Sequence, residues 1–122
     1  MKKTLLLAAV LGFTAVAIGA FGAHALKNLL ESNGRTLTFE LANRYHFFHA
    51  LALLSISFQK EISAHWTSLL WLLGIILFSG SLYVLAIFNL TTIAWLTPIG
   101  GVFLLAGWFS LIWKAIKLKK PV

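Results

Sequence analysis

The sequence predicts an all-α integral membrane protein: one domain, a bundle of four transmembrane helices, with a short interfacial segment between helices 1 and 2. Three observations support this prediction. Of the 122 residues, 60% are hydrophobic and only 11% are charged, and the mean hydropathy is +0.91. A soluble domain of this length needs far more polar surface, because it buries only about two-thirds of its chain. Long apolar runs alternate with short polar segments, and the basic residues gather in those segments and at the termini.

The first apolar run predicts a transmembrane helix over about residues 4–26. A helix of about twenty residues covers about 30 Å, the thickness of the hydrocarbon core. The run is also similar to a signal peptide, since two lysines precede it and Ala23-His24-Ala25 matches a cleavage site. Small residues at intervals of four, including Gly12 and Gly19, favour a retained span that another helix approaches closely.

Residues 25–35 predict the short interfacial segment. Its leucines share one helical face, and Lys27, Asn28 and Glu31 lie on the opposite face. Asn33-Gly34 then favours a break. A turn or a short helix lying at the membrane surface is the structure that this pattern predicts.

The second span is predicted over about residues 38–59, and it is the weakest of the four on hydropathy alone. Its first half carries many polar side chains, and a continuous apolar stretch is limited to residues 50–56. The residues of this span nevertheless recur with good helical periodicity. The gap between the neighbouring spans also requires a membrane crossing here.

The third and fourth spans are predicted over about residues 64–88 and 93–114. Pro98 falls early in the fourth span, where a missing backbone N–H costs no helical hydrogen bond. The central polar and small residues of these spans predict close helix packing, as do the glycines of the first span. The residues assigned to packing are Gly12, Gly19, Gly22, Ser79, Gly80, Ser81, Thr97, Gly100 and Gly101.

The distribution of lysine and arginine predicts the orientation. Seven lie in the N-terminal segment, the second loop and the C-terminal segment, whereas three lie in the first loop and the start of the second span. By the positive-inside rule, both ends of the chain are expected in the cytoplasm of a bacterial cell, with the protein in the inner membrane.

One group of polar residues is the candidate functional site. Asn43, His46 and His49 recur at intervals of three, which places them on one helical stripe, and His24 closes the first span in the same leaflet. Imidazole binds metals and titrates near neutral pH, so the group favours a metal, haem or proton site. The alternative is hydrogen bonding between helices. The full candidate set is His24, Asn43, Tyr45, His46 and His49.

Other chemistry is poorly represented in the sequence. There are no cysteines and only three acidic residues, and neither a nucleophile–base arrangement nor a phosphate-binding glycine loop is found. The histidines match no strong metal signature such as H-E-x-x-H. We therefore expect neither enzymatic activity nor a bound cofactor or metal. A nucleic-acid partner is not expected either, because the positive charges form topology-setting clusters and not a phosphate-binding face.

Five segments occur in order along the chain: residues 19–26, Tyr45 with residues 49–52, residues 78–83, residues 97–101, and Gly107-Trp108. Together they resemble a small bacterial inner-membrane family, domain of unknown function 423. The resemblance implies a retained first span and a four-helix membrane protein, and it carries no established activity. It includes His24 and His49, whereas His46 falls where the family accepts other residues, so it favours a polar contact between His24 and His49.

Three classes of function are consistent with the sequence. A non-enzymatic membrane component, such as an assembly factor or accessory subunit, is favoured because packing motifs are abundant and reactive groups are few. A small-solute or ion transporter or channel formed by an oligomer requires a polar path. A metal-binding or haem-binding protein requires His24 and His49 as ligands. Membrane lipids are the expected partners, together with a second copy of the chain or another membrane protein.

Overall fold

The computed structural model describes residues 2–118, and in this range the chain is helical with short connections. The prediction of an all-α fold is confirmed. Four long α-helices are joined by a short α-helix and one turn of 3₁₀ helix. They are α1 (Lys2–His24), α2 (Lys27–Asn33), α3 (Thr36–Ser57), α4 (His65–Phe88), η1 (Thr91–Ile93) and α5 (Leu96–Lys117).

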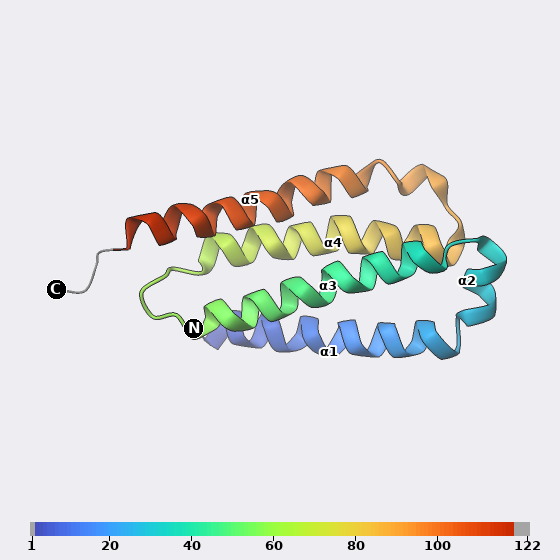
Figure 1. The fold of residues 1–122 in the computed structure, drawn as a ribbon, viewed down its shortest axis with the longest axis horizontal. Helices are drawn as coiled ribbons and strands as arrows, with labels where there is room; N and C mark the ends of the chain where they lie inside the picture. Colours follow the sequence, from blue (N-terminus) through green and yellow to red (C-terminus); the bar gives the residue numbers. More distant parts are fainter. Residues whose placement is uncertain (1, 119–122) are drawn as a thin grey trace.

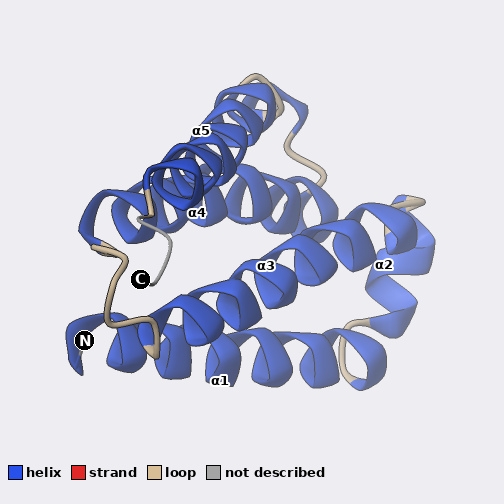
Figure 2. Cartoon of the chain, turned by 60° about the vertical axis from the view of Figure 1, so that its left-hand side comes forward, coloured by secondary structure: helices blue, strands red, loops and turns tan. Residues whose placement is uncertain are grey.

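The long helices run up and down, and each packs on the long helices next to it in the chain (Figure 1). Turning the molecule shows α1 beside α3 and α4 beside α5, with α3 against α4 joining the two pairs (Figure 2). The beginning of α1 and the end of α5 lie at the same end of the bundle (Figure 1). Lys119 and Lys120, which contribute to the predicted charge bias, lie outside the described residues.

The segment predicted at the membrane surface forms α2, which caps the bundle at the far end from the N-terminus. Gly34 ends α2 with a φ of 65°, a conformation that glycine adopts without a steric penalty. The Asn33 amide Nδ2 donates to the carbonyls of Ala86 and Ile87 at 3.0 and 3.1 Å. These carbonyls belong to the last turn of α4, where the helix leaves its own C=O groups unpaired. Thus α2 holds the ends of α3 and α4 together.

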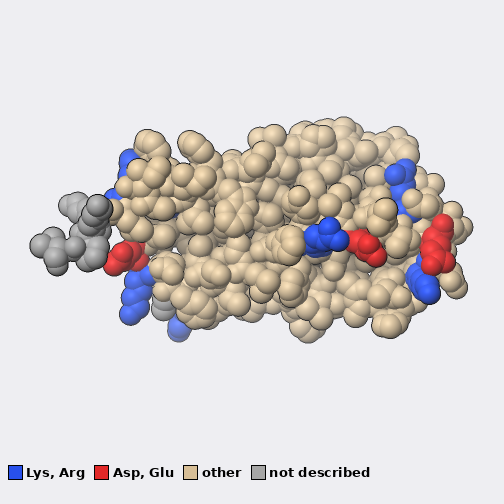
Figure 3. Space-filling model, in the orientation of Figure 1, with Lys and Arg blue, Asp and Glu red and all other residues tan. Residues whose placement is uncertain are grey.

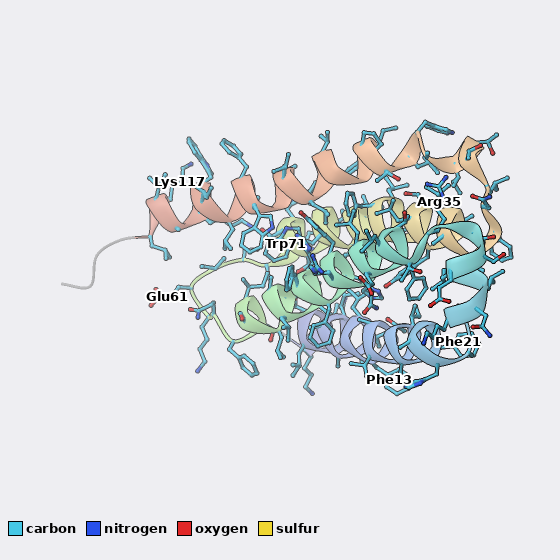
Figure 4. All side chains as sticks on the ribbon, turned by 45° about the vertical axis from the view of Figure 1, so that its right-hand side comes forward. Phe13, Phe21, Arg35, Glu61, Trp71 and Lys117 are labelled. Carbon is cyan, nitrogen blue, oxygen red and sulfur yellow. The ribbon has the colours of Figure 1, made fainter. Side chains whose placement is uncertain are left out.

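Apolar side chains cover the outside of the bundle, and many polar side chains lie inside it. On the face shown in Figure 3, most charges lie toward the two ends, one basic and one acidic side chain lie together right of the middle, and the area to their left is uncharged. Phe13 points away from α1 and is 76% exposed, whereas Trp71 lies between the helices and is fully buried (Figure 4). The buried polar residues are Thr4, His46, His49, Ser57, Thr67, Ser68, Ser79 and Ser81. This arrangement is the one expected of a helical membrane protein.

Three stretches of residues 2–118 are long and apolar enough to cross a membrane: Lys2–His24, His65–Phe88 and Thr91–Lys117. The polar first half of α3 lowers its mean hydropathy below the value that marks a candidate span, although α3 is about as long as its neighbours and packs against them. A count based on hydropathy is therefore one span lower than the four predicted.

Small residues let the helices approach where packing was predicted, with two exceptions. At Gly100 an added Cβ would collide with the backbone of Phe78, so α5 touches α4 there at closer range than any larger residue permits. A Cβ at Gly22 would collide with the Phe39 ring. By contrast, Cβ atoms at Gly12 and Gly80 would meet nothing within 4 Å, so these two glycines make no close contact within residues 2–118. Gly74 and Gly107, which were not in the predicted set, do make close contacts, with Leu104 and Trp71.

Hydrogen bonds supplement this packing on both sides of α4. Ser79 Oγ donates to the carbonyl of Ala42 on α3 at 2.7 Å, and Ser81 Oγ bonds to Thr97 Oγ1 on α5 at 2.6 Å. Each hydroxyl is inside the bundle, where water is not available as an alternative partner. Small polar residues thus fix the positions of α3 and α5 relative to α4.

Candidate functional site

The polar stripe of α3 faces the interior of the bundle, where it meets three other helices. His46 and His49 are each only 4% exposed, and Asn43 is partly buried one turn earlier. Because residues three apart lie on one side of a helix, the three side chains point into the same interior region. They do not form a single cluster, however. Asn43 and His46 bond toward α1 and α4, and His49 bonds toward α5.

Asn43 and His46 belong to one directed chain of hydrogen bonds. Asn43 Nδ2 donates to the Ala15 carbonyl at 2.8 Å and to the Tyr83 hydroxyl at 3.0 Å. The Tyr83 hydroxyl lies 3.0 Å from His46 Nδ1, and His46 Nε2 lies 3.2 Å from Thr14 Oγ1. Thr14 in turn donates to the Leu11 carbonyl at 3.0 Å.

The direction of this chain determines the tautomer of His46. Thr14 uses its only hydrogen on a carbonyl, so its oxygen must accept from His46 Nε2–H. His46 Nδ1 is then unprotonated and accepts the Tyr83 hydroxyl hydrogen, while Tyr83 accepts from Asn43. Each donor meets an acceptor, so His46 is a neutral imidazole that links α1 to α4.

His49 has the opposite tautomer. Its Nδ1 lies 2.7 Å from the Tyr45 carbonyl, and its Nε2 lies 2.9 Å from the indole Nε1 of Trp108. A carbonyl can only accept and an indole N–H can only donate, so Nδ1 carries the proton and Nε2 accepts. The edges of Trp71 and Trp108 meet the imidazole at centroid distances of 5.8 and 5.9 Å. His49 therefore joins α3 to α5 within an aromatic cage.

These bonds use both ring nitrogens of both histidines. A metal ligand needs an unprotonated nitrogen with a free lone pair, and a general base needs that lone pair directed at a substrate or a nucleophile. In each ring the lone pair accepts a hydrogen bond from a neighbouring side chain, the Tyr83 hydroxyl or the Trp108 indole. In the part of the chain that the structure describes, histidine, cysteine and acidic side chains form no group of three that could hold a metal ion. The arrangement is suited to holding helices together.

The structure does not bring His24 to the stripe. His24 is exposed at the end of α1, and no side-chain hydrogen bond within residues 2–118 joins it to His49. The antiparallel packing of α1 and α3 places His49 near the middle of α1, about 20 Å along the axis from His24, because each helical residue adds about 1.5 Å. The predicted contact between His24 and His49 is absent for this reason.

Tyr45, the remaining predicted residue, lies at the edge of the His49 cage. Its side chain is 38% exposed, its ring stacks on that of His49 with an interplanar angle of 19°, and its centroid is 4.9 Å from that of Phe78. It supports His49 through its ring and through its backbone carbonyl.

The side chains that other helices place against the histidines were not in the predicted site. Thr14 lies on α1, Tyr83 and Trp71 lie on α4, and Trp108 lies on α5. Tyr83 and Trp108 do fall within the segments that carry the family resemblance, and this was the one signal that could have identified them. Helical phase within α3 contains no information about which side chains of other helices it meets.

Known proteins similar to this chain are membrane proteins without an assigned activity. The family model described as "Protein of unknown function (DUF423)" matches residues 18–101. A UPF0382 membrane protein of Haemophilus influenzae is 41% identical over 121 residues, covering 97% of both chains. The UPF0382 inner membrane protein YgdD of Escherichia coli K12 is 42% identical over 120 residues, covering 95% of this chain and 91% of the relative. A UPF0382 membrane protein of Staphylococcus saprophyticus is 40% identical, covering 97% of this chain and 100% of the relative. No solved structure matches significantly.

Removing the Tyr83 hydroxyl tests whether the hydrogen-bonded chain stabilises the fold. Tyr83→Phe leaves His46 Nδ1 without its donor and one Asn43 hydrogen without its acceptor. An unpaired buried polar group costs about 1–3 kcal/mol, so we expect a clear fall in the unfolding temperature in detergent. Tyr45→Phe is the matched control, because no hydrogen bond of residues 2–118 involves the Tyr45 hydroxyl. Equal unfolding temperatures for the two variants would contradict the role of the chain.

Proposed function

The chain belongs to the DUF423 family of membrane proteins, whose function is unknown, and we propose that it is a non-enzymatic component of the bacterial inner membrane, an assembly factor or accessory subunit. One observation carries the proposal: the interior histidines are already hydrogen-bonded to their neighbours at both ring nitrogens. In a metal site the unprotonated nitrogen binds the ion, and in a catalytic site it faces the reacting group, whereas here it accepts from the Tyr83 hydroxyl or the Trp108 indole. Here the most reactive side chains of the bundle serve to join helices.

We further propose that all four long helices cross the membrane. Two of the polar residues that lower the hydropathy of α3, His46 and His49, face the other helices. Two others, Glu40 and Arg44, are exposed in its first half. The apolar residues Leu37, Phe48 and Leu51 are also exposed on its outer face. A span needs an apolar surface toward lipid and tolerates polar groups that are paired within the bundle. From Phe48 to the end of α3, the exposed side of the helix carries no charged residue and fulfils this requirement, whereas the exposed charges lie in the half nearer α2.

The proposed orientation places both termini in the cytoplasm. Lys2, Lys3, Lys60 and Lys117 come from segments at one end of the bundle, the end where α1 begins and α5 finishes. The opposite end carries fewer basic residues. This asymmetry supports cytoplasmic termini by the positive-inside rule.

Reporter fusions at residues 33, 60 and 90 test the span count and the orientation together. Alkaline phosphatase is active outside the cytoplasm, and green fluorescent protein fluoresces when it folds inside. We expect phosphatase activity at residues 33 and 90 and fluorescence at residue 60. If α3 does not cross the membrane, the fusions at 33 and 60 will report the same side, which would contradict the four-span proposal.

A transporter or channel within one protomer is less well supported than a non-enzymatic component. The directed chain of hydrogen bonds ends at the Leu11 carbonyl, and Leu11 belongs to an apolar core cluster with Leu53, Ile56 and Trp71. Such a cluster interrupts a polar path. A pore would require the axis of an oligomer.

The partner proposed for this component is a second copy of the chain. An apolar groove of about 610 Å³ runs between α1 and α3, and Gly12, which has no close neighbour, lies in its wall with Phe13, Val16 and Leu51. Copies inserted by the same charge bias share one orientation, so their α1 helices would meet in parallel. Gly12 has no side chain to keep a second helix at a distance, so it suits that parallel contact.

Purified protein in mild detergent tests the proposal against the cofactor-binding alternative. For wild type and His49→Ala we expect no Soret band and no stoichiometric metal, because both nitrogens of His49 are bonded to protein groups. A band or a metal that is lost in His49→Ala would make this a cofactor protein and overturn the proposal.

Light scattering on the wild-type sample should give the protein mass of two or more copies, and the mass of one would contradict self-association.

A further inference from the structure

A recess of about 270 Å³ lies between α1, α2 and α3 at the α2 end of the bundle, apart from the histidines. Two glycines of α1 lie in its wall. A Cβ at Gly19 would lie 2.6 Å from Asn43 Oδ1, and a Cβ at Gly22 would collide with Phe39, so larger residues at these positions would displace the α3 side chains that line the recess. The polar residues in its wall are Lys27, Glu31, Thr36, Glu40 and Asn43.

Asn43 contributes an unused acceptor to this recess. Both hydrogens of its Nδ2 are used, on the Ala15 carbonyl and the Tyr83 hydroxyl, which fixes the orientation of the amide. A flipped amide would place oxygen against the Ala15 carbonyl. Its Oδ1 receives no hydrogen bond within residues 2–118, and it is not an enclosed atom, since Ser68 Oγ is the only enclosed side-chain oxygen or nitrogen lacking a partner in that range.

Two carboxylates accompany this oxygen. Glu40 lies three residues before Asn43, on the same side of α3, and Glu31 comes from α2. Both are exposed, and no side-chain hydrogen bond among the described residues involves a carboxylate. The recess therefore presents acceptors in excess of donors, with Lys27 as the one positive charge in its wall.

We propose that this recess binds the primary ammonium group of a zwitterionic molecule. An ammonium group has three N–H donors, which match Glu31, Glu40 and Asn43 Oδ1, and the adjoining anion of the ligand pairs with Lys27. Two sources share this chemistry: the phosphoethanolamine headgroup of a membrane lipid, and free phosphoethanolamine. The site goes beyond the proposed function and does not depend on it.

Comparing two lipids on the wild-type protein tests the proposal. Phosphatidylcholine has the same phosphate and the same net charge as phosphatidylethanolamine, but methyl groups replace its three N–H donors. We expect native mass spectrometry of the detergent-solubilised full chain to show phosphatidylethanolamine bound at least about tenfold more tightly, the value of one charge-assisted hydrogen bond. Equal affinities for the two lipids and no binding of free phosphoethanolamine would overturn the proposal.

Paired variants locate the binding. Glu40→Gln removes one charge from the recess and breaks no hydrogen bond of the protein, so the fold should persist, and we expect about tenfold weaker binding of phosphatidylethanolamine. Glu61→Gln is the matched control, because it makes the same change in the loop at the opposite end, and it should bind like wild type. If Glu40→Gln binds like wild type, or if both variants weaken binding equally, the recess is not the site.

Free phosphoethanolamine identifies the source of the ammonium group. Binding of the free compound to wild type, weakened by Glu40→Gln and not by Glu61→Gln, supports the recess with a soluble ligand. Preference for phosphatidylethanolamine without binding of the free compound supports it with a lipid headgroup.

Discussion

Inside a membrane bundle, a polar side chain has only other protein groups to bond to, and in this protein α3 concentrates that requirement. Asn43 and His46 bond to α1 and α4, and His49 bonds to Trp108 on α5. Water cannot replace a lost partner in this environment, so a change in the order or rotation of the helices would leave several buried groups unpaired. The hydrogen bonds of one helix thereby determine the positions of the other three.

Small residues meet the second condition, which is that the helices come close enough for these bonds to form. Gly19 and Gly22 bring α1 against α3, and Gly100 brings α5 against α4. Apolar side chains provide no net attraction between helices in lipid, so close packing and hydrogen bonds must hold the bundle together. Hydrogen bonds and close packing occur at the same helix interfaces: Asn43, which bonds to Ala15, also lies against Gly19.

The sequence was most informative where the signal is local. Long apolar runs predicted the helices, and the spacing of Asn43, His46 and His49 predicted that their side chains share one face. Partners from other helices, such as Tyr83 and Thr14, were not predictable, because helical phase does not encode which helices meet. The supposed approach of His24 to His49 neglected the rise along α3, which carries His49 about 20 Å from the end of α1. Gly12 and Gly80 match packing motifs, yet a Cβ at either position would meet nothing within 4 Å.

The central claim is that the two buried histidines are neutral, have opposite tautomers, and are saturated by hydrogen bonds. Nitrogen-15 NMR of the protein labelled at its imidazole rings, in lipid bilayers at neutral pH, tests this directly, with His46→Gln and His49→Gln used to assign the signals. The account predicts a protonated Nε2 and a bare Nδ1 for His46, and a protonated Nδ1 and a bare Nε2 for His49. A doubly protonated ring, a metal-shifted resonance, or the same tautomer at both positions would contradict it.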